Sequence, residues 1–222
     1  MKRNQEGFKT REVHAGVSPD PVTGAILTPI YQSTTFVQES VENYMSKGYS
    51  YSRSGNPTVV ALEKRINSLE GGVGAACFAT GMAATSAVMM ALLNQGEHAI
   101  CSDVVYGGTH RLSTRVLSRF GVEYSFIDTA DAQAVKAAIK PNTKLIFTET
   151  PANPTLKLTD IAAVSAVAKA AGIPHAVDNT FLTPYYQRPL ELGADVVVHS
   201  TTKYMDGHNS TVGGAIVAAD QG

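Results

Sequence analysis

The sequence predicts an α/β fold with a mainly parallel seven-stranded sheet in three layers. From residue 56 onward, seven short apolar runs alternate with amphipathic or Ala-rich segments. Strands of a parallel sheet are buried on both faces, so they read as continuous apolar runs, and helical crossovers cover the two faces. The length of 222 residues suits one large core of this kind. The runs cover residues 75–79, 98–102, 123–128, 144–149, 173–179, 194–200 and 212–218.

The first predicted helix begins at Asn56-Pro57, because Pro suits the first helical position, and it ends at Gly71-Gly72. The residues between them place apolar side chains on one helical face. Later helices are predicted over residues 82–93, 109–120, 132–139 and 161–171, between successive apolar runs.

Residues 1–55 differ from the rest of the chain. They are rich in Gly, Pro, Ser, Thr and Tyr and show little helical periodicity. We therefore expect an extended N-terminal arm over residues 1–55, followed by one large domain over residues 56–222.

Composition excludes several classes of function. The net charge of −1 leaves no basic footprint for nucleic acid or for a membrane surface. No apolar run approaches the roughly 20 residues of a membrane-spanning helix, and the N-terminus resembles no signal peptide. Two cysteines are too few for a disulfide framework, which favours a reduced, cytoplasmic protein. The six histidines lack ligand spacing, so no metal site is expected.

Ligands of parallel α/β sheets bind beyond the carboxyl ends of the strands, so the residues after each apolar run are the candidates for a binding site. The first run leads into Thr80-Gly81-Met82. A Gly turn that opens a helix presents free N–H groups to a phosphate, although the same turn also forms for geometry alone. The earlier Gly71-Gly72-Val73-Gly74 does not fit GxGxxG and precedes the strand, which argues against a dinucleotide site.

Two ionisable residues follow later runs. Asp178 ends the fifth run, where a buried carboxylate needs a partner; it could serve a ligand or cap the next helix. Lys203 follows the sixth run and three hydroxyl residues. A Lys is most often a surface residue, but this position at the ligand edge favours burial and use as a nucleophile.

The three strand ends are consistent with one site. A helix N-terminus with Ser and Thr hydroxyls would hold a phosphate, a Lys amine would form a Schiff base, and an Asp would hold a pyridinium nitrogen protonated. These are the partners that pyridoxal 5′-phosphate (PLP) requires.

Six ordered blocks then resemble the Cys/Met-metabolism, or trans-sulfuration, enzymes of the aspartate-aminotransferase-like PLP fold. The resemblance runs from about Thr10 to Ala218. The blocks are Tyr51-Ser52-Arg53-Ser54-Gly55-Asn56-Pro57-Thr58, Ala79-Thr80-Gly81-Met82-Ala83, Val105-Tyr106-Gly107-Gly108-Thr109, Glu149-Thr150-Pro151-Ala152-Asn153-Pro154, Asp178-Asn179-Thr180-Phe181 and His199-Ser200-Thr201-Thr202-Lys203-Tyr204.

The resemblance implies catalytic roles for Lys203, which would bind the cofactor and shuttle protons, for Asp178 on the pyridine nitrogen, and for Tyr106, which would stack on the ring. It implies phosphate binding by the backbone of Gly81 and Met82 and the hydroxyls of Ser200 and Thr202. Asn153 would lie near the phenolic oxygen or the substrate carboxylate. Tyr51 and Arg53 would reach the phosphate of a neighbouring subunit, so the family implies a dimer that shares its sites, and a homotetramer.

The reaction within the family is less determined. The resemblance implies γ-replacement or γ-elimination on O-acylhomoserine or cystathionine. Within the family, the sequence looks most similar to cystathionine γ-synthase and γ-lyase. O-acetylhomoserine sulfhydrylase and methionine γ-lyase stay open, and Gly108 argues against the latter, which tends to carry Cys there. Family chains continue beyond the position of Gly222 with a small domain and a carboxylate-binding Arg. A PLP-binding fragment without activity is therefore the alternative to an enzyme of cysteine and methionine metabolism.

Overall fold

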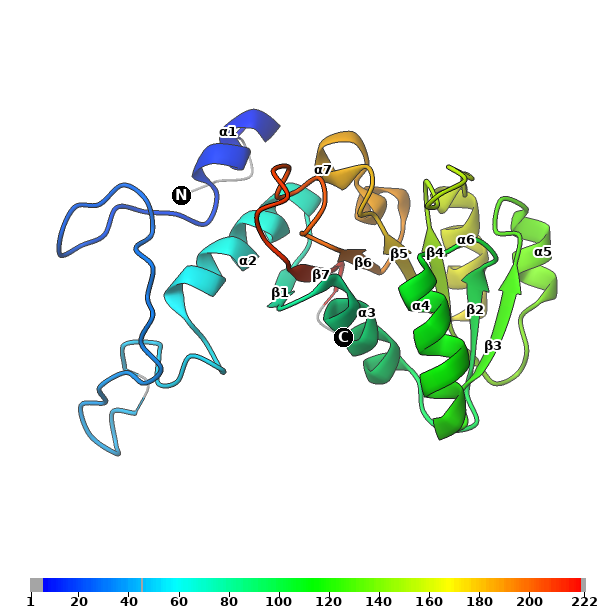
Figure 1. Cartoon of the computed structure of the whole chain (residues 1–222), viewed down its shortest axis with the longest axis horizontal. Coiled ribbons are helices and arrows are strands. Elements are labelled where there is room, and N and C mark those ends of the chain that lie inside the picture. The colour runs from blue at the N-terminus through cyan, green and yellow to red at the C-terminus, as the bar shows by residue number, and fades with distance from the viewer. Residues whose placement is uncertain (1–5, 45, 221–222) are drawn as a thin grey trace. The chain divides into compact units, whose positions relative to one another are not determined.

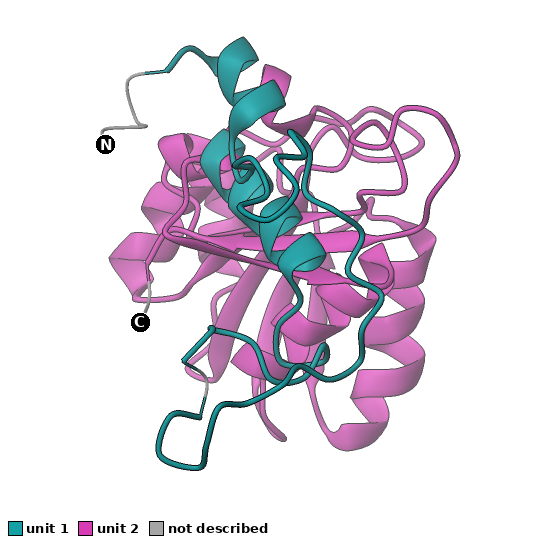
Figure 2. Ribbon diagram, turned by 90° about the vertical axis from the view of Figure 1, so that its left-hand side faces the viewer, with its two compact units in different colours: residues 1–69 teal, residues 70–222 magenta. Residues whose placement is uncertain are grey.

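The structure is a computed structural model that describes residues 6–44 and 46–220. The chain divides into two compact units, Met1–Leu69 and Glu70–Gly222, coloured teal and magenta in Figure 2. The sequence prediction of an arm over 1–55 and a domain over 56–222 places the boundary earlier, and that division stays a prediction. Within the described residues, no helix is both long enough and apolar enough to cross a membrane.

Over its described residues, the first unit contains two helices, α1 (Phe8–His14) and α2 (Pro57–Glu70, whose last residue falls in the second unit). The chain between them is largely irregular, and α1 is an exception to the predicted extended arm. Asn56 stabilises the start of α2 as expected, because its Oδ1 accepts from the amide of Thr58 at 2.9 Å. Its Nδ2 donates to the carbonyl of Tyr31 at 2.8 Å. Helix α1 has no capping side chain and no buried residue. It therefore lacks the cap and the buried apolar face by which a sequence predicts a helix.

The second unit is built on a seven-stranded sheet in the order β1-β7-β6-β5-β4-β2-β3 (Figure 1). The central strands from β3 to β6 run parallel, and β7 pairs antiparallel with both β1 and β6. The predicted α/β class and mainly parallel sheet are confirmed. The strands are β1 (Gly74–Phe78), β2 (His98–Ser102), β3 (Glu123–Ile127), β4 (Thr143–Glu149), β5 (His175–Asp178), β6 (Val196–His199) and β7 (Gly214–Ala218).

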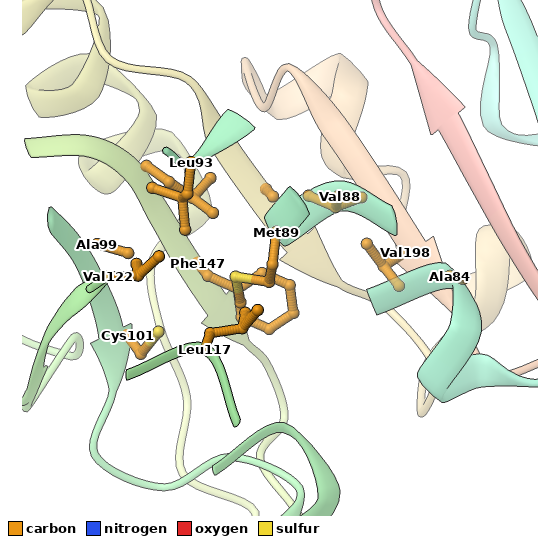
Figure 3. Close-up of a cluster of buried hydrophobic side chains, with 12 residues drawn as sticks. Ala84, Val88, Met89, Leu93, Ala99, Cys101, Leu117, Val122, Phe147 and Val198 are labelled. Atoms are coloured by element: carbon orange, nitrogen blue, oxygen red, sulfur yellow. The ribbon is translucent and has the colours of Figure 1, made fainter. Parts of the chain in front are cut away.

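Helices cover both faces of this sheet, which produces the three predicted layers. Alternate residues of one strand face opposite layers, as Cys101 and Ile100 of β2 show: they belong to different apolar clusters. One cluster packs beneath α3, where Figure 3 shows Met89 and Leu117 against Phe147. The other packs beneath α5 and α6. The remaining helices of this unit are α3 (Gly81–Leu92), α4 (Gly107–Arg111), α5 (Ala132–Ala137), α6 (Ile161–Ala171) and α7 (Thr183–Tyr186).

The helix predicted over residues 109–120 is not one regular α-helix. It begins as α4, widens into a π-helical turn over Leu112–Val116 and tightens into a 3-10 turn over Leu117–Phe120. The hydroxyls of Ser113, Thr114 and Ser118 donate to the carbonyls four residues earlier at 2.7–3.0 Å. Such bonds compete with the backbone and bend helices, which explains the irregularity.

Candidate functional site

A cavity of about 260 Å³ opens at the carboxyl ends of the central strands in the second unit. This is the edge at which parallel α/β sheets bind ligands. Tyr51 and Arg53 lie in the first unit, where the Arg53 guanidinium stands 4.9 Å from the centre of the Tyr51 ring. The other predicted site residues all line the cavity: Gly81, Met82, Tyr106, Asn153, Asp178, Ser200, Thr202 and Lys203.

The N-terminus of α3 forms one wall. Thr80 caps the helix, because its Oγ1 accepts from the amide of Ala83 at 2.9 Å and its carbonyl accepts from the amide of Ala84 at 3.2 Å. The first four amides of an α-helix have no acceptor within the helix. The amides of Gly81 and Met82, in the first turn of α3, are therefore donors that remain for an anion.

Ser200 and Thr202 bring hydroxyl groups to the same wall. A Cβ atom at Gly81 would lie 2.9 Å from Ser200 Oγ, which shows how closely the Ser200 hydroxyl approaches the start of α3. The Thr202 hydroxyl is already paired with Gly213, since it accepts from that amide at 3.0 Å and donates to that carbonyl at 3.2 Å. Ser200 thus brings a hydroxyl next to the start of α3, whereas the Thr202 hydroxyl is engaged with Gly213.

Asp178 ends β5 and is buried with 9% of its surface exposed. Burial raises the pKa of Asp178, against the opposing effects of hydrogen bonds from Thr180 and the charge of His199. Its Oδ1 accepts from the amide of Thr180 at 3.0 Å. The residue that precedes α7 is Leu182, so Asp178 is not the cap of that helix. A carboxylate this deeply placed is best stabilised by a cationic partner.

Lys203 lies in the turn that follows β6, and its side chain is exposed at the cavity. The expected burial of Lys203 is wrong for this structure, because the residue lies four positions beyond the end of the strand, in a turn closed by a bond from the Gly207 amide to its carbonyl at 2.9 Å. Within the described part of the chain, its Nζ makes no hydrogen bond to another protein group. The amine is therefore free to reach a ligand.

The ring of Tyr106 packs over Gly108 and Met82. A Cβ atom at residue 108 would lie 2.4 Å from Tyr106 Cε1 and 2.7 Å from Met82 Sδ. No side chain larger than hydrogen fits there unless the ring moves. The absence of a side chain at Gly108 therefore allows the Tyr106 ring to take its position at the cavity.

Glu149 also lines the cavity, although its sequence pattern predicted no role for it. It ends β4, lies beside Asp178 in the strand register and is 6% exposed. Burial first, and the charge of Asp178 second, raise the pKa of Glu149 to about 7. Its position at the end of an apolar run was a usable signal, the same one that singled out Asp178.

A buried polar network supports the strand ends. Glu70 Oε1 lies 2.5 Å from His199 Nε2 and accepts from Asn179 Nδ2 at 3.2 Å, and all three residues are fully buried. Asn179 Nδ2 also donates to the carbonyl of Gln187 at 2.8 Å. Buried polar groups that pair in this way favour a single arrangement of the backbone. Asn179 directly follows Asp178 and His199 directly precedes Ser200, so the network holds both strand ends.

The donor set of the cavity fits PLP. Amides and a hydroxyl at one end suit a phosphate, a buried carboxylate at another suits a ring nitrogen that carries a proton, and an aromatic ring supplies a stacking surface. A Lys amine completes the set as the group that reacts with an aldehyde.

Comparisons with known proteins agree with this chemistry. The family model described as "Cys/Met metabolism PLP-dependent enzyme" matches residues 9–222. A protein named "Probable cystathionine gamma-synthase" from Herpetosiphon aurantiacus is 52% identical over 96% of this chain and 66% of its own length. The cystathionine gamma-lyase of Bacillus subtilis is 50% identical over 96% of this chain and 55% of its own. Cystathionine beta-lyase MetC of the same organism is 47% identical over the whole chain and 56% of its own length.

The fold comparison gives the same result. The crystal structure of metB from Corynebacterium glutamicum superposes with a TM-score of 0.96 at 49% identity, over 100% of this chain and 57% of that one. The chain thus spans between about half and two thirds of the length of the relatives it matches.

Proposed function

The chain belongs to the family of Cys/Met metabolism PLP-dependent enzymes, and from this premise we propose that it carries the cofactor site of a trans-sulfuration enzyme. The proposed reaction is γ-replacement or γ-elimination on O-acylhomoserine or cystathionine. The observation that carries the proposal is the meeting of Gly81, Asp178 and Lys203 at one cavity.

Each residue has a separate task in this proposal. When bound, PLP supplies an aldehyde that condenses with amines and a ring that accepts electrons from the substrate Cα. The amides of Gly81 and Met82 and the hydroxyl of Ser200 hold the phosphate, and the Thr202 hydroxyl joins them when it turns from the Gly213 carbonyl to the phosphate. Asp178 keeps the ring nitrogen protonated, and Tyr106 covers one face of the ring.

Lys203 holds the cofactor before substrate arrives and then acts as a base at the substrate Cα. The γ-reactions also require a proton to leave Cβ, so the base must reach two carbon atoms in turn. An exposed Lys side chain on a turn supports this role, because its four-carbon stem places one amine at several positions. Asn153, at the cavity wall, orients the phenolic oxygen or the substrate carboxylate.

The proposed partner is a second copy of the chain. Tyr51 and Arg53 lie together in the first unit, and the Arg53 guanidinium is the type of group that binds phosphate. In our proposal, each subunit of a homodimer supplies this pair to the site of its neighbour, two dimers form a tetramer, and the protein acts in the cytoplasm.

O-acetylhomoserine sulfhydrylase and methionine γ-lyase activities are the alternatives within the family. Gly108 bears on this choice, since the Tyr106 ring occupies the space that a Cys side chain would need. This packing favours the γ-synthase and γ-lyase reactions over methionine γ-lyase. The alternative of a different class is a protein that binds PLP but catalyses no reaction.

Product analysis tests the proposal. The native protein that contains this chain is purified with PLP and incubated with O-acetylhomoserine or O-succinylhomoserine plus cysteine, or with cystathionine alone. Cystathionine from the first mixtures indicates γ-replacement, and 2-oxobutanoate with cysteine from the last indicates γ-elimination. Pyruvate with homocysteine would indicate β-elimination and contradict the proposed reaction, whereas PLP binding without any product would support the non-enzymatic alternative.

A further inference from the structure

Glu149 joins two loops of the cavity through a single carboxylate. Its Oε2 accepts from the backbone amide of Tyr106 at 2.5 Å, and its Oε1 accepts from the backbone amide of Asn153 at 2.9 Å. Tyr106 comes from the loop after β2, and Asn153 from the loop after β4. Both residues line the cavity, so one side chain fixes two separate parts of its wall.

The position of Glu149 is energetically costly. The carboxylate is buried beside that of Asp178, and burial of like charges is unfavourable. The two amide hydrogen bonds offset part of this cost, because hydrogen bonds to a charged acceptor are stronger than neutral ones. With both oxygens directed at backbone amides, Glu149 acts on the wall of the cavity.

The same two loops are also joined on the outside. Lys157 Nζ lies 3.0 Å from Asp103 Oδ1 and 2.8 Å from Asp103 Oδ2, in a contact that is about one-third exposed. Exposed ion pairs of this kind contribute about 0–1 kcal/mol. Lys157 also pairs with Asp128 Oδ1 at 2.8 Å, beyond the end of β3. It therefore offers a comparison for Glu149, because it ties the same two loops without touching the cavity.

We propose that Glu149 is a positioning residue of the cofactor site, which sets the Tyr106 ring and Asn153 at their places through the two backbone amides. This inference rests on the proposed function, because it assigns Glu149 to the site that binds PLP. Glu149 touches neither substrate nor cofactor in this role. It acts through the residues that do.

Two substitutions separate geometry from charge. Glu149→Gln keeps the shape but has one acceptor oxygen and one NH₂ group, so it must release either Tyr106 or Asn153. Glu149→Asp keeps the charge and both oxygens but is one methylene shorter, so it cannot reach both amides. If positioning is the role, both variants lose function; if only a negative charge is needed, the Asp variant keeps it.

The experiment measures PLP binding and loop order in the native protein at about pH 8, where Glu149 is ionised. We expect the Kd for PLP to rise about tenfold in both Glu149 variants, the equivalent of one lost hydrogen bond. The visible circular dichroism of bound PLP should fall, and hydrogen exchange of the peptides that contain residues 106 and 153 should accelerate in the apo protein. Lys157→Gln should stay within about twofold of wild type in PLP affinity.

Three results would overturn the inference: wild-type PLP affinity and dichroism in Glu149→Gln, wild-type values in Glu149→Asp alone, or an equal loss in Lys157→Gln. If Glu149→Gln does not fold, the Asp variant decides by the same measurements. Failure of the wild-type protein to bind PLP is a different outcome, since it refutes the proposed function first.

Discussion

Gly81 and Ser200 touch across the top of the sheet: a Cβ atom built on Gly81 would lie 2.6 Å from the Cβ of Ser200 and 2.9 Å from its Cα. The start of α3 and the end of β6 are thus as close as their backbones permit. Gly81 is required here for proximity, since its backbone is ordinary for any residue of a helix start.

Gly81→Ala should therefore separate the two halves of the proposed phosphate site. We expect the Kd for PLP to rise by at least about tenfold, because the amides and the Ser200 hydroxyl no longer converge. Fluorescence titration with PLP provides the measurement. Gly74→Ala is the matched control, since a Cβ atom there meets nothing within 4 Å; equal losses in the two variants would contradict the prediction.

Lys203→Ala should abolish the covalent attachment of PLP. Borohydride reduction followed by peptide mass mapping should find the adduct on Lys203 in the wild type and on no residue in the variant. Lys169→Ala, an exposed position on α6, is the control and should retain the adduct. An adduct that persists on another lysine of the Lys203 variant would refute the assignment.

Asp178→Asn tests the charge at the ring nitrogen while it preserves local structure. The Asn oxygen can still accept from the Thr180 amide, as Asp178 does at 3.0 Å. Breaking a buried ion pair costs about 3–5 kcal/mol, so turnover should fall by orders of magnitude while the protein stays folded. Steady-state kinetics provides the measurement, with Asp195→Asn as a control outside the cavity. Near-normal turnover would leave Asp178 with only a structural role.

A mixing experiment tests the proposed sharing of sites between subunits. Arg53→Ala and Lys203→Ala proteins are each expected to be inactive, but hybrid dimers would contain one site with both native residues. Activity should return to about one quarter of wild type after random exchange, since half of the dimers are hybrids and each has one complete site. Mixing Arg53→Ala with the double variant is the control. No recovery after verified exchange would place Arg53 in its own subunit's site or outside any site.

Glu149 predicts a pH dependence of the stability of the apo protein. Burial, and then the charge of Asp178, raise its pKa from 4.5 to about 7. Between these values the folded state binds more protons than the unfolded state, so the contribution of Glu149 to stability is lost as pH rises through this range. The change amounts to about 3 kcal/mol at most.

His175 acts in the opposite direction, because burial lowers its pKa to about 3 and its folded form stays neutral while the unfolded form gains a proton at low pH. The wild-type curve alone therefore does not isolate Glu149. The difference in unfolding free energy between wild type and Glu149→Gln does, and it should fall from about pH 4.5 to about pH 7 and then level off. Urea unfolding of both apo proteins across this range gives the difference. A constant difference would contradict the prediction.

The sequence was most informative where buried runs met turns. The strand over His98–Ser102 and the helix over Ile161–Ala171 were predicted to the residue, because both are apolar segments between clear stops: Gly172 ends the helix with a positive φ of 66°. The lining of the cavity by Asp178 and Lys203 followed from the rule that such sheets bind ligands at strand ends.

Other features depend on contacts that no local pattern reports. The exposure of Lys203 follows from the path of the turn after β6, and the role of Glu149 follows from where two distant amides happen to point. Strand order is a third example: nothing in the apolar run over residues 212–218 shows that it enters the sheet antiparallel, between the first strand and the sixth.

That placement of β7 has a consequence for how the chain reaches its native state. Among the strands that the structure describes, β1 pairs with β7 alone, so residues 74–78 leave the ribosome long before this neighbour, residues 214–218, has been synthesised. Until then β1 has no place in the sheet, and β6 presents an unpaired edge of three consecutive valines. Unpaired apolar edges invite association with other chains. A nascent chain that pauses shortly before residue 214 should therefore be the species that most needs a chaperone.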